Sequence, residues 1–196
     1  MIAPAHYALS EILIIIASIY TARHLSITKN HFALIGILLL GLTATIGAIR
    51  FGITNSELLI QLNKILALYA GVSALSLIST QLIFNSYLRN FGKFILLAAL
   101  ISIASAIIFP KLLLLNLIYL WSTISIILAF YLCEKTMPSK ILNGILMSIL
   151  ILGFLTVSKR GLFTESIGLD LSFHLYHIFI AIWVFSMNHV LKLRND

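Results

Sequence analysis

Long apolar runs, separated by short polar breaks, recur about seven times along this chain of 196 residues. Each run is close to the ~20 residues that an α-helix needs to cross the hydrocarbon core of a bilayer. Since unpaired backbone polar groups are costly in lipid, these runs are expected to be helical. The pattern predicts an all-α, polytopic integral membrane bundle that forms a single domain. We expect spans at about 7–22, 32–51, 58–84, 94–109, 112–132, 141–157 and 170–191.

Residues that end helices stand between the runs. Pro110 separates the fourth run from the fifth, and Pro138 lies in the connection before the sixth. Proline has no backbone N–H and its ring clashes with the preceding turn, so it is typical of helix boundaries. Gly161 and Gly168 mark the longest predicted connection, 158–169, as a loop.

Composition agrees with lipid as the solvent. Apolar residues make up 61% of the chain, charged residues only 10%, and the mean hydropathy is +1.09, whereas soluble domains have about 25% charged residues. The net charge of +7 does not indicate nucleic-acid binding, because the Lys and Arg residues lie in short loops beside apolar runs. A single cysteine, Cys133, excludes an internal disulfide and a CxxC motif.

The distribution of Lys and Arg predicts the orientation in the membrane. Cytoplasmic loops carry an excess of these residues. One side holds eight of them: Arg23, Lys29, Arg89, Lys93, Lys135, Lys140, Lys192 and Arg194. The other side holds four, Arg50, Lys111, Lys159 and Arg160, so we expect an outside N-terminus and a cytoplasmic C-terminus. The length of the chain, its composition rich in Ile, Leu, Lys and Asn, and its short loops indicate a protein of a bacterial cytoplasmic membrane. The first helix is expected to be retained, because no basic n-region of a signal peptide precedes it.

Polar side chains gather in the predicted outer halves of several spans. At membrane depth such residues are expensive, and they usually face a bundle interior or a wet cavity. The pattern predicts an outward-opening pocket for a lipid or small-molecule ligand, with Arg50, Asn63, Lys64 and Tyr119 as candidate binding residues. Arg50 could instead snorkel to the headgroups, and Lys64 could pair with an acid. The candidate acids are Glu11, Glu57 and Asp170.

The last span carries the sharpest pattern. Asp170, His174 and His177 stand at i, i+4 and i+7, which places them on one face of a helix. Such a face can hold a metal such as zinc, with His6 as a third ligand, or a metal-free acid/base pair. Glu11 is a candidate general base and Asp170 a candidate catalytic carboxylate. The alternative is that Asp170 caps the helix and that both His rings lie at the membrane interface.

The stretch DLSFHLYHIFIAIW, residues 170–183, together with GAIRFG, residues 47–52, resembles the CREST superfamily, which includes the alkaline ceramidases and the progestin and adiponectin receptors. The resemblance implies a seven-helix, zinc-dependent membrane hydrolase that acts on a lipid amide or ester. His174 and His177 would then be metal ligands. Arg50 stands where the family has a metal-binding His, so His6 would have to supply that ligand, or the site is metal-free.

Three functions remain open at this point. The first is the lipid hydrolase. The second is a protein that binds or transports a small molecule, in which Arg50 and Lys64 hold an anionic ligand. The third is a structural membrane protein whose polar residues only lock the helices together. Clustering of the histidines at helix ends speaks against a haem site, and the last span has no interior Lys for a retinal Schiff base.

Overall fold

The computed structural model describes residues 4–54, 56–132, 136–157 and 168–191, and this part of the chain is helical throughout, without strands. Six helices are long and apolar enough to cross a membrane, and residues Met137–Gly153 form a shorter apolar helix. The elements are α1 (Tyr7–Ile27), α2 (His31–Gly52), α3 (Glu57–Phe84), the 3₁₀ turn η1 (Arg89–Phe91), α4 (Gly92–Ile108), α5 (Pro110–Leu132), α6 (Met137–Val157) and α8 (Leu169–Val190).

Each predicted apolar run matches one helix, and the differences are at the ends; the runs predicted to end at 109 and 191 each extend one residue beyond α4 and α8. α1 continues beyond Arg23 to Ile27, and the chain turns at Lys29, whose φ of 56° is left-handed. Pro110 is the first residue of α5. α6 begins four residues earlier than predicted and includes Pro138 in its first turn. Proline is tolerated there because the first N–H groups of a helix have no partner within the helix.

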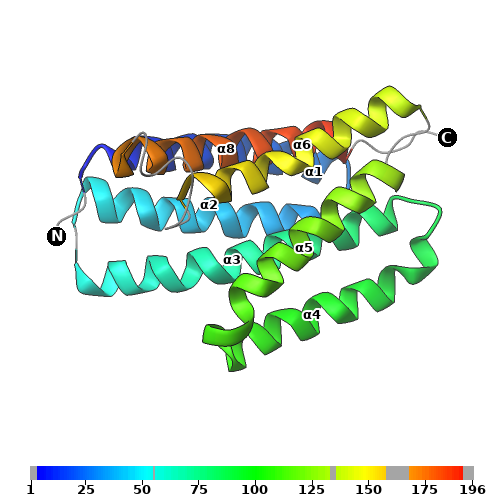
Figure 1. The fold of residues 1–196 in the computed structure, drawn as a ribbon, viewed down its shortest axis with the longest axis horizontal. Coiled ribbons are helices and arrows are strands. Elements are labelled where there is room, and N and C mark those ends of the chain that lie inside the picture. Colours follow the sequence, from blue (N-terminus) through cyan, green and yellow to red (C-terminus); the bar gives the residue numbers. More distant parts are fainter. Residues whose placement is uncertain (1–3, 55, 133–135, 158–167, 192–196) are drawn as a thin grey trace.

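Six helices close into a ring in the order α1, α2, α3, α5, α6, α8, in which each helix packs on the next and α8 packs on α1. α4 lies outside this ring, at the edge of the bundle, and packs on α3 and α5 (Figure 1). α1 and α8 run in the same direction, since side-chain hydrogen bonds join Ser10 to His174 near their starts and Thr21 to Asn188 near their ends. The first and last helices are therefore neighbours.

α3 changes character along its length. From Val72 to Ile83 every residue is buried, because α2, α4 and α5 all contact this helix. A helix enclosed in this way has no single apolar face. Before Ala70, by contrast, α3 has only exposed or half-buried residues, including Lys64 and Leu68. Gly36 of α2 permits a close approach to the buried half, because a Cβ at that position would lie 2.9 Å from the Cα of Ala74.

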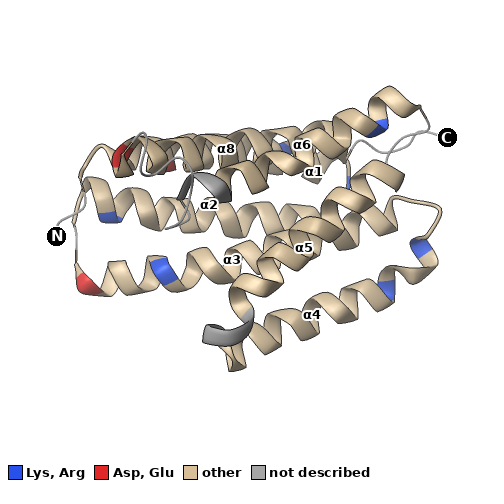
Figure 2. Cartoon of the chain, in the orientation of Figure 1, with Lys and Arg blue, Asp and Glu red and all other residues tan. Residues whose placement is uncertain are grey.

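The outer surface is apolar and the charges lie toward the ends. Large apolar side chains such as Ile16, Leu42 and Phe94 are exposed on α1, α2 and α4, as expected for surfaces that face lipid. The acidic residues that the structure describes lie in the half of the bundle where α1, α3 and α8 begin (Figure 2). We call this half the N-terminal end. Cations of the described chain mark the opposite end: Arg23, Lys29, Arg89, Lys93 and Lys140.

A buried amide network ties the opposite end together. Asn30, which is fully buried, donates through Nδ2 to Thr28 Oγ1 at 2.8 Å and to the backbone oxygen of Leu191 at 3.0 Å. Asn85 at the end of α3 donates to Asn30 Oδ1 at 2.7 Å. The network joins the α1–α2 turn to α3 and α8. It fixes the ring at the end remote from the candidate site described next.

Candidate functional site

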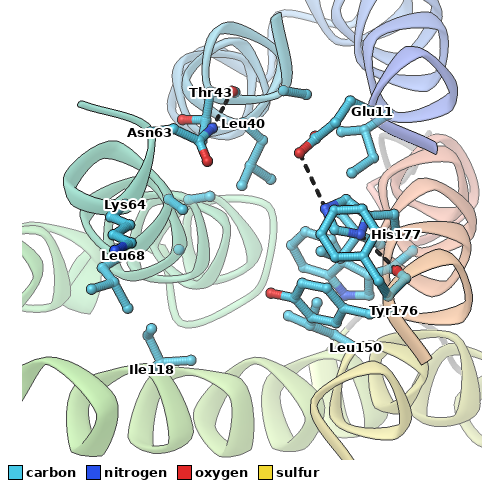
Figure 3. A pocket seen from close by; sticks show the side chains of 18 of the residues that line it. Glu11, Leu40, Thr43, Asn63, Lys64, Leu68, Ile118, Leu150, Tyr176 and His177 are labelled. Atoms are coloured by element: carbon cyan, nitrogen blue, oxygen red, sulfur yellow. Dashed lines mark hydrogen bonds and ion pairs between the residues drawn. The ribbon is translucent and has the colours of Figure 1, made fainter. Parts of the chain in front are cut away.

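A cavity of about 500 Å³ lies inside the ring, within the size range of small-molecule sites. Most of its wall is apolar, and its polar groups come from four helices: α1, α2, α3 and α8. Along α3 it extends from Asn63 to Leu75, which corresponds to about 18 Å at 1.5 Å per residue. Figure 3 shows Glu11 and His177 on one side of the cavity and Lys64 on the other. The polar lining residues are Glu11, Thr43, Arg50, Asn63, Lys64, Tyr176 and His177.

Glu11 of α1 and His177 of α8 form a buried pair. Glu11 Oε1 lies 3.3 Å from His177 Nε2, and the two residues are only 6% and 7% exposed. The other ring nitrogen of His177, Nδ1, is 2.8 Å from the backbone oxygen of Phe173. A carbonyl oxygen only accepts hydrogen bonds, so Nδ1 carries a proton. On the other side of the ring, Nε2 is within ion-pair distance of the Glu11 carboxylate.

Gly47 of α2 creates the space for the Glu11 carboxylate. A Cβ at this position would lie 2.4 Å from Glu11 Oε1 and 3.1 Å from Asn63 Nδ2. The Glu11 carboxylate and the Asn63 amide therefore both lie against α2 at Gly47, where the helix has no side chain. Any larger residue would displace at least one of them.

Arg50 and Asn63 form the adjacent part of the wall. Arg50 Nη1 donates to Asn63 Oδ1 at 3.3 Å, and Asn63 Nδ2 donates to the backbone oxygen of Thr43 at 3.3 Å. The Arg50 guanidinium lies 4.6 Å from the centre of the Phe51 ring, in the range of a cation–π contact. Its Nε is buried and has no hydrogen-bond partner among the described residues. Arg50 thus has a donor that no described residue uses.

Lys64 does not have the acidic partner that the sequence predicted. Glu11 is paired with His177, Glu57 accepts a hydrogen bond from Gln61 at 3.0 Å, and Asp170 accepts one from Tyr7. Within the described part of the chain, no carboxylate lies within ion-pair distance of Lys64 or Arg50. Both cations line the cavity, so its wall carries positive charge that these acids do not neutralise.

The predicted face of the last helix contacts three different residues of α1. Asp170 accepts from the Tyr7 hydroxyl, His174 Nδ1 lies 3.1 Å from Ser10 Oγ, and His177 meets Glu11. Asp170 does not cap α8, because the N-cap is Gly168, whose φ of 82° suits glycine. The alternative in which the acid caps this helix is therefore wrong. The shared face itself exists as the spacing predicted.

An aromatic layer separates the cavity from the outermost polar groups. The Tyr7 and Phe173 rings stack at 3.9 Å between centres, and Phe173 lies 4.0 Å from the His177 ring. Asp170, His174 and His6 are not among the residues that line the cavity. The two predicted catalytic carboxylates, Glu11 and Asp170, are therefore on different sides of this layer.

The predicted metal ligands do not converge. His6 and His174 have ring centres 5.1 Å apart, but both ring nitrogens of His177 are engaged, by Phe173 and Glu11. In residues 4–191, leaving aside the segments that the structure does not describe, no three His, Cys, Asp or Glu side chains are grouped as a metal site requires. These residues do not fit a three-ligand zinc centre, and we derive no step through a metal.

The structure brings together Glu11, Arg50, Asn63, Lys64 and His177, whereas Tyr119 is 45% exposed and is not among the lining residues. Sequence reasoning missed the roles of Gly47, Tyr7 and Ser10. A signal existed for Tyr7 and Ser10: Tyr7, Ser10 and Glu11 stand at i, i+3 and i+4, and polar residues at this spacing lie on one side of a helix. Gly47 carried no such signal.

Comparison of the chain with protein-family models, with curated proteins and with solved structures found no match. The function is therefore argued from the geometry of the cavity.

Proposed function

We propose that this protein is an integral membrane protein whose seven apolar helices, α6 included, cross a bacterial cytoplasmic membrane. The N-terminal end faces outward and the C-terminus lies in the cytoplasm. One observation supports this orientation: Arg23, Lys29, Arg89, Lys93 and Lys140 lie at the end opposite to the N-terminal end. An excess of cations is typical of cytoplasmic loops.

We further propose that the cavity binds an anionic amphiphile, a molecule with one negatively charged head and an apolar chain. The observation that carries this proposal is that Arg50 and Lys64 line an otherwise apolar cavity while Glu11, Glu57 and Asp170 are engaged elsewhere. Cations at membrane depth are costly unless an opposite charge or water compensates them. An anionic head beside Arg50 and Lys64 would supply that charge.

The apolar part of the cavity fits the remainder of such a ligand. Below the polar groups the wall consists of side chains such as Leu75, Ile118, Leu150 and Ile180. Burial of an apolar chain there contributes about 25 cal/mol per Å² of surface removed from water, although lipid already offers part of this gain. Selectivity would therefore depend mainly on the head group, because the surrounding bilayer competes for the chain.

The experiment compares a charged and a neutral ligand with the same chain. Purified protein in phosphatidylcholine nanodiscs is titrated calorimetrically with decanesulfonate and with decanol. We expect saturable binding of decanesulfonate and much weaker binding of decanol. Arg50→Gln and Lys64→Gln should each weaken decanesulfonate binding by about tenfold to a hundredfold, the range for one lost charged hydrogen bond.

Lys140→Gln is the matched control, since it removes a cation from the opposite end of the bundle. Its affinity for decanesulfonate should equal that of the wild type. Equal binding of decanesulfonate and decanol, or equal losses in all three variants, would contradict an anion site at Arg50 and Lys64.

The Glu11–His177 pair favours a second candidate, hydrolysis of a lipid amide or ester held in the cavity. A carboxylate beside an imidazole can act as a general base or a general acid. In the CREST superfamily, which the sequence resembles, such a hydrolase would hold zinc, but the predicted ligands His174, His177 and His6 do not converge in the described part of the chain. Elemental analysis of the wild type beside a His174→Ala, His177→Ala double variant tests it. Near-stoichiometric zinc that is lost in the variant would favour the hydrolase over a binding protein.

A further inference from the structure

A second hollow lies at the opposite end of the bundle, between the end of α3 and the start of α4. Its volume is about 360 Å³, and it is lined by Phe84, Arg89, Asn90 and Lys93. Arg89 and Asn90 belong to the turn η1, and Lys93 is the second residue of α4. Three side chains that can donate hydrogen bonds thus surround one hollow, and two of them are cations.

Contacts within the chain hold this hollow in shape. The backbone N–H of Leu88 donates to Ser86 Oγ at 3.0 Å, and the N–H of Arg89 donates to the backbone oxygen of Ser86 at 3.2 Å. The Phe84 ring packs directly on Gly92, where a Cβ would lie 2.7 Å from the ring. The turn is therefore formed without a ligand, which lowers the entropic cost of binding one.

No acid of the described chain balances the two cations of the hollow. The acids in that part of the chain lie at the N-terminal end (Figure 2), and Arg89 and Lys93 have no carboxylate there within ion-pair distance. The N-cap of α4, Phe91, makes no side-chain hydrogen bond to the first turn. The positive end of this helix therefore adds to the charge of the two side chains, and the hollow favours an anion.

An exposed apolar face leads away from the hollow along α4. Leu97, Leu100 and Ile101 follow Lys93 at i+4, i+7 and i+8, so they share one face of the helix. Each of the three is more than half exposed, and Phe94 beside Lys93 is 70% exposed, because α4 lies outside the ring. The face from Lys93 to Ile101 is about 12 Å long at 1.5 Å per residue. An aliphatic chain can lie along it while a charged head occupies the hollow.

We propose that this hollow binds the phosphate group of an anionic phospholipid, and that one acyl chain of the lipid lies along the exposed face of α4. The Arg89 guanidinium offers a fork of donors to phosphate oxygens, Lys93 adds a point charge, and the Asn90 amide adds a neutral donor. Basic pockets beside membrane helices are typical sites for anionic lipid heads. The adjoining apolar face favours a lipid over free phosphate. This inference rests on the proposed placement of the helices in a membrane and is independent of the ligand in the cavity.

The test compares two lipids that differ only in their head groups. Purified protein in detergent micelles is titrated with dioleoyl phosphatidylglycerol or with dioleoyl phosphatidylcholine, and native mass spectrometry counts the bound lipids. We expect the first phosphatidylglycerol to bind at least about tenfold more tightly than phosphatidylcholine, since the choline cation is repelled by the hollow. Glycerol phosphate at the same concentration should not displace the bound lipid, because it has no acyl chain to lie on α4.

The double variant Arg89→Gln, Lys93→Gln removes both charges from exposed side chains. It should bind phosphatidylglycerol about tenfold to a hundredfold more weakly than the wild type, and no more tightly than phosphatidylcholine. Lys140→Gln is the matched control, because it removes a cation at the same end of the bundle but outside the hollow. It should bind phosphatidylglycerol as the wild type does. If the double variant does not fold, each single substitution should show part of the loss.

Three outcomes would overturn the inference. Equal affinity for the two lipids, or an equal loss in Lys140→Gln, would mean that the hollow does not select a lipid head. Displacement by glycerol phosphate would show that the phosphate group binds without the acyl chain. Loss of the bound lipid in Arg50→Gln, with binding retained in the Arg89→Gln, Lys93→Gln variant, would place the lipid in the cavity and leave the proposed anion site there standing.

Discussion

Replacement of Gly47 by alanine is expected to damage the site more than the fold. The new Cβ would lie 2.6 Å from Glu11 Cδ, whereas carbon atoms in good contact are at least about 3.5 Å apart. The carboxylate must therefore move by about 1 Å. Since its oxygen is 3.3 Å from His177 Nε2, a shift of about 1 Å away from the ring takes the two atoms beyond ion-pair distance.

The energetic consequence follows from two opposing contributions. Loss of a polar contact to a charged group costs about 1.5–3 kcal/mol, and alanine stabilises a helix interior by up to about 1 kcal/mol relative to glycine. We expect the free energy of unfolding to fall by about 0.5–2 kcal/mol. The far end of a long side chain can yield, so the fold should survive, while the affinity for decanesulfonate should fall because Asn63, which bonds Arg50, is crowded as well.

The assay combines reversible unfolding in mixed micelles with calorimetric titration of decanesulfonate in nanodiscs. Gly71→Ala is the matched control: it also adds one methyl group to a helix that lines the cavity, but its Cβ would meet Ile118 at an ordinary 3.4 Å. That variant should keep the stability of the wild type and its affinity for decanesulfonate. If Gly47→Ala gained stability and bound decanesulfonate as tightly as the wild type, the close approach of Glu11 and Asn63 to Gly47 would be refuted as the basis of the site.

Other parts of the bundle yield three further predictions. Gly36→Ala should lower the free energy of unfolding by about 1–3 kcal/mol, because its Cβ would meet backbone atoms of Ala74 that cannot rotate away; an unchanged unfolding curve would contradict this. Asn85→Ala leaves the buried Asn30 oxygen without its donor and should cost about 1–3 kcal/mol with no change in decanesulfonate affinity, which calorimetry would check. Cys133 should react with a membrane-impermeant maleimide only after spheroplasts are opened, and labelling of intact spheroplasts would invert the proposed orientation.

The helices could be predicted because length and hydropathy decide whether a segment is stable across lipid. Their ends were less predictable. The rule that proline breaks helices holds for the interior, and Pro138 lies in a first turn, where the missing N–H costs nothing. The all-helical fold is confirmed by the structure.

The site was only partly predictable, because a pattern in one helix does not identify the residues of other helices that this helix contacts. The spacing of Asp170, His174 and His177 correctly placed them on one face of the helix. It could not show that each of the three would contact a different residue of α1. Lys64 illustrates the same limit. Three acids were equally suitable partners in the sequence, and each is engaged by another side chain in the fold.

The contact between the first and last helices has a consequence for how the protein is made. Glu11 enters the membrane before its partner His177, which is synthesised more than 160 residues later. At ~5–20 residues per second, the carboxylate waits about ten to thirty seconds for the imidazole. During that interval it must stay protonated, reach toward the surface or be shielded by the insertion machinery. Assembly of the binding site therefore waits for the synthesis of α8, and a ribosome that stalls before α8 leaves an open bundle with an unmatched acid for quality control to recognise.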